Sequence, residues 1–183
     1  MRPAVFLDRD GTVNVDAGFV RQPADVVLIP GAARAIARLN AAQVPVVIVT
    51  NQSGIGRGLM STADYAAVRD RLAELLREQE AYVDATYECP HDPRVGACEC
   101  RKPGTALFTR AARDLDLALD RSWYVGDRWR DIAAALELGG EGVLVPAAST
   151  PDEDLRLARE RARVVDTLGE AVDTVLASLA AVR

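Results

Sequence analysis

Two aspartates stand two positions apart, directly after a short apolar run near the amino terminus. Asp8 and Asp10 follow residues 5–7 and precede Gly11 and Thr12. Carboxylates at positions i and i+2 of an extended segment point to the same side, where they repel each other unless a cation lies between them or one is protonated. An oxygen-binding ion such as Mg²⁺ meets this need. The pair therefore indicates metal or acid–base chemistry, although its spacing alone is equally compatible with two solvated aspartates in a polar turn.

A second group of reactive side chains lies in one short window. All three cysteines and the only histidine of the chain stand between positions 89 and 100. Three thiolates and one imidazole form the closed tetrahedral set that holds a structural Zn²⁺ and leaves no position for water. The expected Zn²⁺ ligands are Cys89, His91, Cys98 and Cys100. The alternative is three reduced thiols beside an unrelated histidine. Because the segment has no hydrophobic periodicity, we expect a Zn-binding loop that owes its order to the metal.

These groups need elements that bring them together, and the hydrophobic pattern predicts an alternation of strands and helices. Such an alternation is typical of an α/β fold, here a Rossmann-like parallel sheet with helices on both faces. Ligands of these sheets bind just beyond the carboxyl ends of the strands, which is where Asp8 and Asp10 stand. The predicted strands cover residues 5–7, 44–49, 85–87, 123–125, 142–145 and 164–165. The predicted helices cover residues 31–42, a long stretch from 61 or 62, a stretch from 105, residues 130–138, and two segments within 151–183.

Length, composition and charge limit the class of protein. The chain has 183 residues, of which 49% are hydrophobic and 27% charged, so we predict a single domain over residues 1–183 that needs no disulfide. Its longest aliphatic run is too short to span a bilayer, and no secretory signal pattern is visible. The net charge of −5 argues against binding to nucleic acid. We therefore expect a cytoplasmic monomer without membrane or nucleic-acid partners.

Four motifs, in order along the chain, resemble those of the haloacid dehalogenase (HAD) superfamily of phosphatases. FLDRDGT is similar to the family's first motif, and the apolar run VVIVT to its second. A lysine in a later loop matches the third motif, and VGD with a further aspartate matches the fourth. The lysine is the only one in the chain, which makes its position informative. The residues that carry these matches are Asp8, Asp10, Thr50, Lys102, Asp127 and Asp131.

The resemblance implies a phosphoryl-transfer mechanism with assigned roles. Asp8 would attack phosphorus and become an aspartyl phosphate, and Asp10 would serve as the general acid and then as the base. Thr50 and Lys102 would hold the transferring oxygens. Asp127 would join Asp8 and the main-chain carbonyl of Asp10 around Mg²⁺. The role of Asp131 stays open at this point.

The cysteine segment narrows the resemblance to one branch of the superfamily. CxH and CxC ahead of RKP are similar to the D-glycero-D-manno-heptose 1,7-bisphosphate phosphatases and the related histidinol-phosphate phosphatases. The stretches NVDAGFV and TNQSGIGRG resemble the heptose branch, which implies a sugar bisphosphate substrate. An arginine can bind a distal phosphate through two parallel hydrogen bonds. The residues that would contact the substrate are Arg9, Asp16, Ala17, Gly18, Phe19, Asn51, Gln52, Ser53, Arg57, Arg101 and Arg128.

Other features favour different functions. Six residues separate His91 from Cys98, a shorter spacing than in the heptose branch. Arg128 follows the Gly-Asp motif at a position where the heptose branch has lysine. Both features favour histidinol phosphate or another small phosphomonoester as the substrate. A Zn-bound binding domain without turnover is a third hypothesis, but such a domain has no use for Asp10 as a proton donor. The gaps between motifs leave no room for a large cap domain, so we expect an open site, with Trp129 as a candidate to line it.

Overall fold

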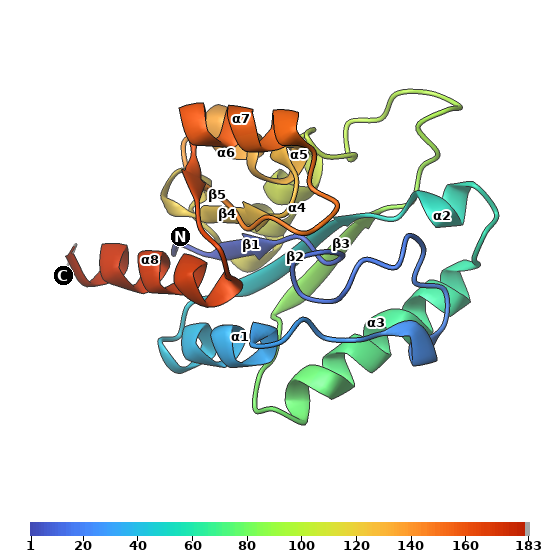
Figure 1. The fold of residues 1–183 in the computed structure, drawn as a ribbon, viewed down its shortest axis with the longest axis horizontal. Coiled ribbons are helices and arrows are strands. Elements are labelled where there is room, and N and C mark those ends of the chain that lie inside the picture. Colours follow the sequence, from blue (N-terminus) through green and yellow to red (C-terminus); the bar gives the residue numbers. More distant parts are fainter. Residues whose placement is uncertain (182–183) are drawn as a thin grey trace.

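The computed structural model describes residues 1–181 and contains a parallel sheet at its centre (Figure 1). Its strand order is β3-β2-β1-β4-β5-β6, and every pairing is parallel. The strands are β1 (Val5–Leu7), β2 (Val46–Asn51), β3 (Ala85–Cys89), β4 (Trp123–Gly126), β5 (Glu141–Leu144) and β6 (Arg163–Val164). The expected α/β fold with a parallel sheet is confirmed.

Helices cover both faces of the sheet. Val5 and Leu7 of β1 face a core that includes α1, α3 and α8, whereas Phe6 faces the opposite core with α4 and α6, as the two-residue period of a strand requires. The α-helices are α1 (Ala32–Ala41), α2 (Ser53–Gly56), α3 (Thr62–Arg77), α4 (Ala106–Leu115), α5 (Trp129–Ile132), α6 (Ala134–Leu138), α7 (Asp152–Arg161) and α8 (Leu168–Ala181). Two short 3₁₀ helices, Pro23–Asp25 and Leu119–Arg121, complete the described elements.

Several predicted boundaries differ from the structure by one or two residues, and one predicted helix is divided. The second strand begins at Val46 and continues to Asn51, because β3 extends to Cys89 and pairs with it that far. The single helix predicted over residues 130–138 is two helices, α5 and α6, that meet at Ala133. There the Leu136 N–H donates to the Ala133 carbonyl, a three-residue hydrogen bond that tightens the turn between them.

No domain-sized insertion separates the strands within residues 1–181. The segment between β1 and β2 contains the first 3₁₀ helix and α1, and the segment between β2 and β3 contains α2 and α3. The predicted absence of a large cap is therefore confirmed for the described chain. None of its helices has the length and apolar character that a membrane span requires.

Candidate active site

A polar cavity of about 160 Å³ lies at the carboxyl ends of three adjacent strands, β2, β1 and β4. Parallel strands end at the same edge of the sheet, so the loops after these three strands converge there. The residues that line the cavity are Asp8, Asp10, Asp16, Gly18, Phe19, Thr50, Asn51, Gln52, Ser53, Arg101, Asp127, Arg128, Arg130 and Asp131. Most of the predicted site residues thus meet in one place. Lys102, from the third motif, is not among the lining residues, but its Nζ contacts Asp8.

Three buried carboxylates gather beside the cavity. One oxygen from each of Asp8, Asp127 and Asp131 lies within 4.8 Å of the others. Burial raises the pKa of Asp8 to about 7; the Lys102 charge opposes this rise, and the Asp131 charge adds to it. Burial and Asp131 likewise raise the pKa of Asp127 to about 6. A buried cluster of oxygen ligands with this excess of negative charge fits a divalent cation such as Mg²⁺.

The ammonium group of Lys102 joins two of these carboxylates. Its Nζ donates to Asp8 Oδ1 at 2.6 Å and to the Val49 carbonyl at 2.6 Å, and lies 2.8 Å from Asp131 Oδ1. Burial alone would lower the pKa of Lys102, but the two carboxylates raise it above its ordinary value. The side chain is therefore a fixed positive charge next to the predicted nucleophile.

The sequence assigned no role to Asp131, and the structure shows its carboxylate in contact with Lys102 and with the start of α5. Its carboxylate pairs with Lys102 and also accepts a hydrogen bond from the Arg128 main-chain N–H at 3.0 Å, at the start of α5. A Cβ atom on Gly126 would lie 2.3 Å from the Asp131 Cβ, so this close approach requires glycine. Asp131 thus connects the end of β4 to the lysine.

The carboxylate of Asp10 is held by a separate set of donors. It accepts hydrogen bonds from Arg9 Nη2 at 2.8 Å, Asn14 Nδ2 at 2.9 Å and Gln52 Nε2 at 2.8 Å. The same Gln52 amide donates to Thr50 Oγ1 at 2.8 Å. The Asp10 side chain is 22% exposed and lines the cavity, so its carboxylate is accessible to a ligand while its orientation is fixed.

The structure does not bring Arg9, a predicted substrate contact, to the cavity. Its side chain is 2% exposed, does not line the cavity, and pairs with Asp10 over the ring of Tyr65. Asp8 and Asp10 alternate with Arg9 along an extended segment, so a side chain between them points away from the side that they share. The same spacing that identified the aspartates therefore places Arg9 behind the site.

The loop after β1 contributes one wall of the cavity. Asp16 Oδ1 accepts the Gly18 N–H at 2.8 Å, and Gly18 has a φ of +85°, a backbone conformation that favours glycine. Phe19 also lines the wall. Besides Arg9, two predicted contacts lie outside the lining, Ala17 and Arg57. The guanidinium carbon of Arg57 lies 5.0 Å from the centre of the Phe19 ring.

Three arginines line the cavity: Arg101, Arg128 and Arg130. Arg101 and Arg128 were expected from the sequence, whereas Arg130 belongs to no motif and was missed. Arg128 Nε lies 3.2 Å from Asp127 Oδ2, and Arg130 Nε lies 3.9 Å from Asp131 Oδ1. Trp129 does not line the cavity, contrary to expectation, because it packs against the apolar cluster under α7. The positive charge of these three side chains suits a ligand with more than one phosphate.

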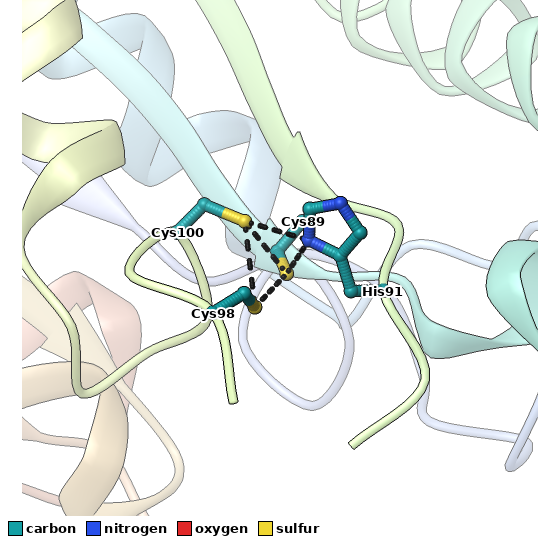
Figure 2. A group of neighbouring side chains, drawn as sticks. All are labelled: Cys89, His91, Cys98 and Cys100. Atoms are coloured by element: carbon teal, nitrogen blue, oxygen red, sulfur yellow. Dashed lines mark hydrogen bonds between the residues drawn. The ribbon is translucent and has the colours of Figure 1, made fainter. Parts of the chain in front are cut away.

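The cysteine and histidine side chains converge at the end of β3 (Figure 2). The three sulfur–sulfur distances are 3.1, 3.5 and 3.6 Å, which is too long for a disulfide bond. His91 Nδ1 faces the sulfurs, 3.1 Å from Cys100 and 3.7 Å from Cys89 (Figure 2). Ligands bound to Zn²⁺ at about 2.3 Å in a tetrahedron are separated by about 3.7 Å. The four groups therefore fit a structural Zn²⁺.

The pKa values of the thiols agree with this donor set. Burial would raise the pKa of Cys98, but hydrogen bonds from Cys89, His91 and Cys100 lower it to about 7. Burial, in contrast, raises the pKa of Cys89 to about 12 when no metal compensates the charge. A buried thiol of this kind becomes a thiolate only beside a strong positive charge, which a bound Zn²⁺ supplies.

Comparisons with known proteins place these features in a family. Residues 99–171 match the HAD-hydrolase-like family. A D-glycero-beta-D-manno-heptose-1,7-bisphosphate 7-phosphatase of Mesorhizobium japonicum is 42% identical over 94% of this chain and 83% of its own length. One of Bordetella bronchiseptica is 39% identical over 90% of this chain and 96% of its own length.

Solved structures agree with the sequence comparisons. The crystal structure of D,D-heptose 1,7-bisphosphate phosphatase from B. bronchiseptica, complexed with magnesium and phosphate, has a TM-score of 0.86 and 37% identity, and covers 97% of this chain and 99% of that one. The corresponding phosphatase from Burkholderia thailandensis has a TM-score of 0.72 and 30% identity, over 96% and 99% of the two chains. The chain therefore belongs to the HAD-like hydrolases, within the family of D-glycero-D-manno-heptose-1,7-bisphosphate 7-phosphatases.

Proposed function

We propose that this chain removes the 7-phosphate of D-glycero-D-manno-heptose 1,7-bisphosphate in a Mg²⁺-dependent reaction. The observation that carries the proposal is the buried pair of Asp8 and Lys102 within a cluster of three carboxylates, at the edge of the sheet where ligands bind. The names of relatives that are about 40% identical over nearly the whole chain support the choice of substrate.

The reaction needs a nucleophile and a proton donor on the same side of the site. An oxygen of Asp8 attacks phosphorus and forms an aspartyl phosphate, while the bond from phosphorus to the sugar oxygen breaks. Asp10 gives a proton to that leaving oxygen, then takes one from the water that attacks the intermediate and releases phosphate. Gln52 and Asn14 orient the Asp10 carboxylate for both steps.

Two side chains bind the transferring oxygens. Lys102 supplies a positive charge already fixed beside Asp8, and Thr50 supplies a buried hydroxyl at the end of β2. Groups that are held in place before the reaction stabilise developing charge without having to reorganise. Asp131, paired with Lys102 and the Arg128 N–H, has the role of holding the lysine.

The residues that would hold Mg²⁺ are Asp8, Asp127 and the main-chain carbonyl of Asp10. Their fit rests on the carboxylates of Asp8 and Asp127, whose pKa values are raised by burial, so that a divalent cation would favour their charged forms. When bound, the ion neutralises negative charge on the phosphoryl oxygens. The crystal structure of the relative from B. bronchiseptica, complexed with magnesium and phosphate, supports this assignment.

Arginines of the cavity lining would bind the second phosphate of the substrate. Arg101 and Arg128 both line the cavity, and a guanidinium group can bind phosphate through two parallel hydrogen bonds. A structural Zn²⁺ on Cys89, His91, Cys98 and Cys100 would order the loop that leads into Arg101 and Lys102. A cytoplasmic location and a monomeric state remain predictions from the sequence.

The proposal is tested by phosphate release with Mg²⁺. The specificity constant kcat/KM is measured for both anomers of heptose 1,7-bisphosphate and for histidinol phosphate, with Asp8→Asn as the inactive control. A large preference for the bisphosphate supports the proposal. A preference for histidinol phosphate would assign the chain to the alternative suggested by the short spacing between His91 and Cys98. Turnover of neither substrate would contradict both.

A further inference from the structure

The end of β2 and the segment that follows it are connected to both ends of the cysteine-containing loop. The Gln52 N–H donates to the Cys89 carbonyl at 2.8 Å, and the Gly56 N–H donates to the Pro90 carbonyl at 2.8 Å. A Cβ atom on Gly56 would lie 2.6 Å from that carbonyl oxygen, so the contact needs glycine. The start of the loop is thus fixed to the segment through main-chain bonds.

The far end of the loop is fixed by one side chain. Asn51 Nδ2 donates to the Lys102 carbonyl at 3.2 Å, and the Lys102 N–H donates to Asn51 Oδ1 at 3.0 Å. Both ends of the Asn51 amide therefore bind the main chain of a single residue. The sequence implied that Asn51 contacts substrate, but its two polar atoms face Lys102.

This contact transmits the rigidity of the sheet to the lysine. Asn51 is the last residue of β2 and is paired in register with Cys89 of β3, so its main chain has little freedom. Lys102, in contrast, belongs to no helix or strand. Its Nζ must nevertheless lie within hydrogen-bond distance of Asp8, because a displacement of about 1 Å can lower a rate by about 100-fold.

We infer that Asn51 is a positioning residue, which acts on turnover by holding the main chain of Lys102 and not by binding substrate. This inference rests on the proposed function, since it takes Lys102 as the group that binds the transferring phosphate. Two hydrogen bonds from a fixed strand end explain how a loop residue reaches the predicted nucleophile.

A double-mutant cycle tests the inference. The cycle consists of Asn51→Ala, Lys102→Met and the double variant. Two quantities are measured for each: kcat/KM for heptose 1,7-bisphosphate, and the affinity of the Mg²⁺-loaded protein for inorganic phosphate, by calorimetry. Asn51→Ala alone should lower kcat/KM by about 10- to 100-fold. If Asn51 acts through Lys102, the same substitution in the Lys102→Met background should weaken phosphate binding by less than about twofold.

The chain provides a matched control. Asn40 makes the same two-bond contact with the main chain of Tyr82, through bonds of 3.1 and 2.9 Å, at the opposite end of the strands. Asn40→Ala removes the same chemical group and should leave kcat/KM within about twofold of the wild-type value. A large loss of activity in this variant would mean that general destabilisation accounts for the Asn51→Ala result, and would overturn the inference.

The remaining outcomes separate the inference from the proposed function. If Lys102→Met turns over at the wild-type rate, the proposed role of Lys102 fails, and the inference fails with it. If Lys102→Met is impaired but Asn51→Ala weakens phosphate binding equally in both backgrounds, Asn51 contacts the ligand independently. In that case the inference is overturned while the proposed function stands.

Discussion

The Nζ atom of Lys102 and the Oδ1 atom of Asp8 lie 2.6 Å apart, although the two residues are separated by 94 positions in the sequence. Their side chains are 1% and 10% exposed. A charge pair in such surroundings is barely screened by solvent, so its effect on a phosphate bound beside it is much larger than in water. This pair brings the first and third motifs of the family into one site.

Replacement of the lysine should remove most of the catalytic power. Lys102→Met deletes the charge beside Asp8 and should lower kcat by about 100- to 1000-fold, the effect typical of losing one preorganised donor to a transition state. Phosphate release measures it. Arg156→Met, which removes a cation from exposed ion pairs with Glu153 and Glu160, is the control. Comparable losses in both variants would contradict a specific role for Lys102.

The Asp8→Asn variant should lose turnover and gain stability at high pH when Mg²⁺ is absent. Burial raises the pKa of Asp8 from 3.8 to about 7. Between these pH values the folded chain binds more protons than the unfolded chain, so the stability of the wild type falls as the pH rises. The amide does not titrate. The melting temperature of the variant, relative to wild type, should therefore increase between about pH 4 and about pH 8. A difference that stays constant would show that Asp8 is not strained by burial.

The sequence predicted the sheet and the site because strand patterns and motif positions are local properties. Strand ends in a parallel sheet share one edge, so Asp8, Thr50 and Asp127 could be placed together before any distance was known. The division of the predicted helix at Ala133 could not be predicted, because it depends on one three-residue hydrogen bond and the hydrophobic pattern does not change there.

The placement of individual side chains within the site was harder to predict. Arg9 was assigned from its position in a motif, although the two-residue period of the segment points its side chain away from the cavity. The contacts of Asp131 and Asn51 with Lys102 depend on how a loop folds back over the sheet, which pattern and spacing do not specify. Arg130 was missed because one arginine after a strand is common in a chain so rich in arginine.

Binding of Mg²⁺ should be coupled to proton release. The pKa values of Asp8 and Asp127 are raised to about 7 and about 6, so both carboxyls are partly protonated at pH 6 and must lose protons to bind the ion. The affinity for Mg²⁺ should increase as the pH rises from about 5 to about 8. Calorimetry at pH 6 in two buffers with different ionisation enthalpies measures the protons released. Identical heats in both buffers would contradict the raised pKa values.

Loss of Zn²⁺ should destabilise the cysteine-containing loop and reduce activity. A chelator should lower the melting temperature. It should also make all three thiols reactive toward a thiol reagent, whereas fewer thiols should react in the metal-loaded protein. Cys98→Ser should reproduce the effect without a chelator. Because Lys102 stands two positions after Cys100, kcat should fall together with stability. An unchanged melting temperature after complete chelation would rule out a structural role for the metal.

Arg101 should determine the preference for a second phosphate. Its Nη1 atom is buried and has no hydrogen-bond partner among residues 1–181, so a phosphate oxygen in the adjacent cavity would satisfy a donor that is otherwise unpaired. Arg101→Ala should raise KM for the bisphosphate by about 10- to 100-fold, which corresponds to the loss of hydrogen bonds to a charged group. The effect on the heptose 7-phosphate, which lacks the second phosphate, should be much smaller. Arg110→Ala, at an exposed position on α4, serves as the control. Equal losses for the two substrates would place Arg101 at the transferring phosphate instead.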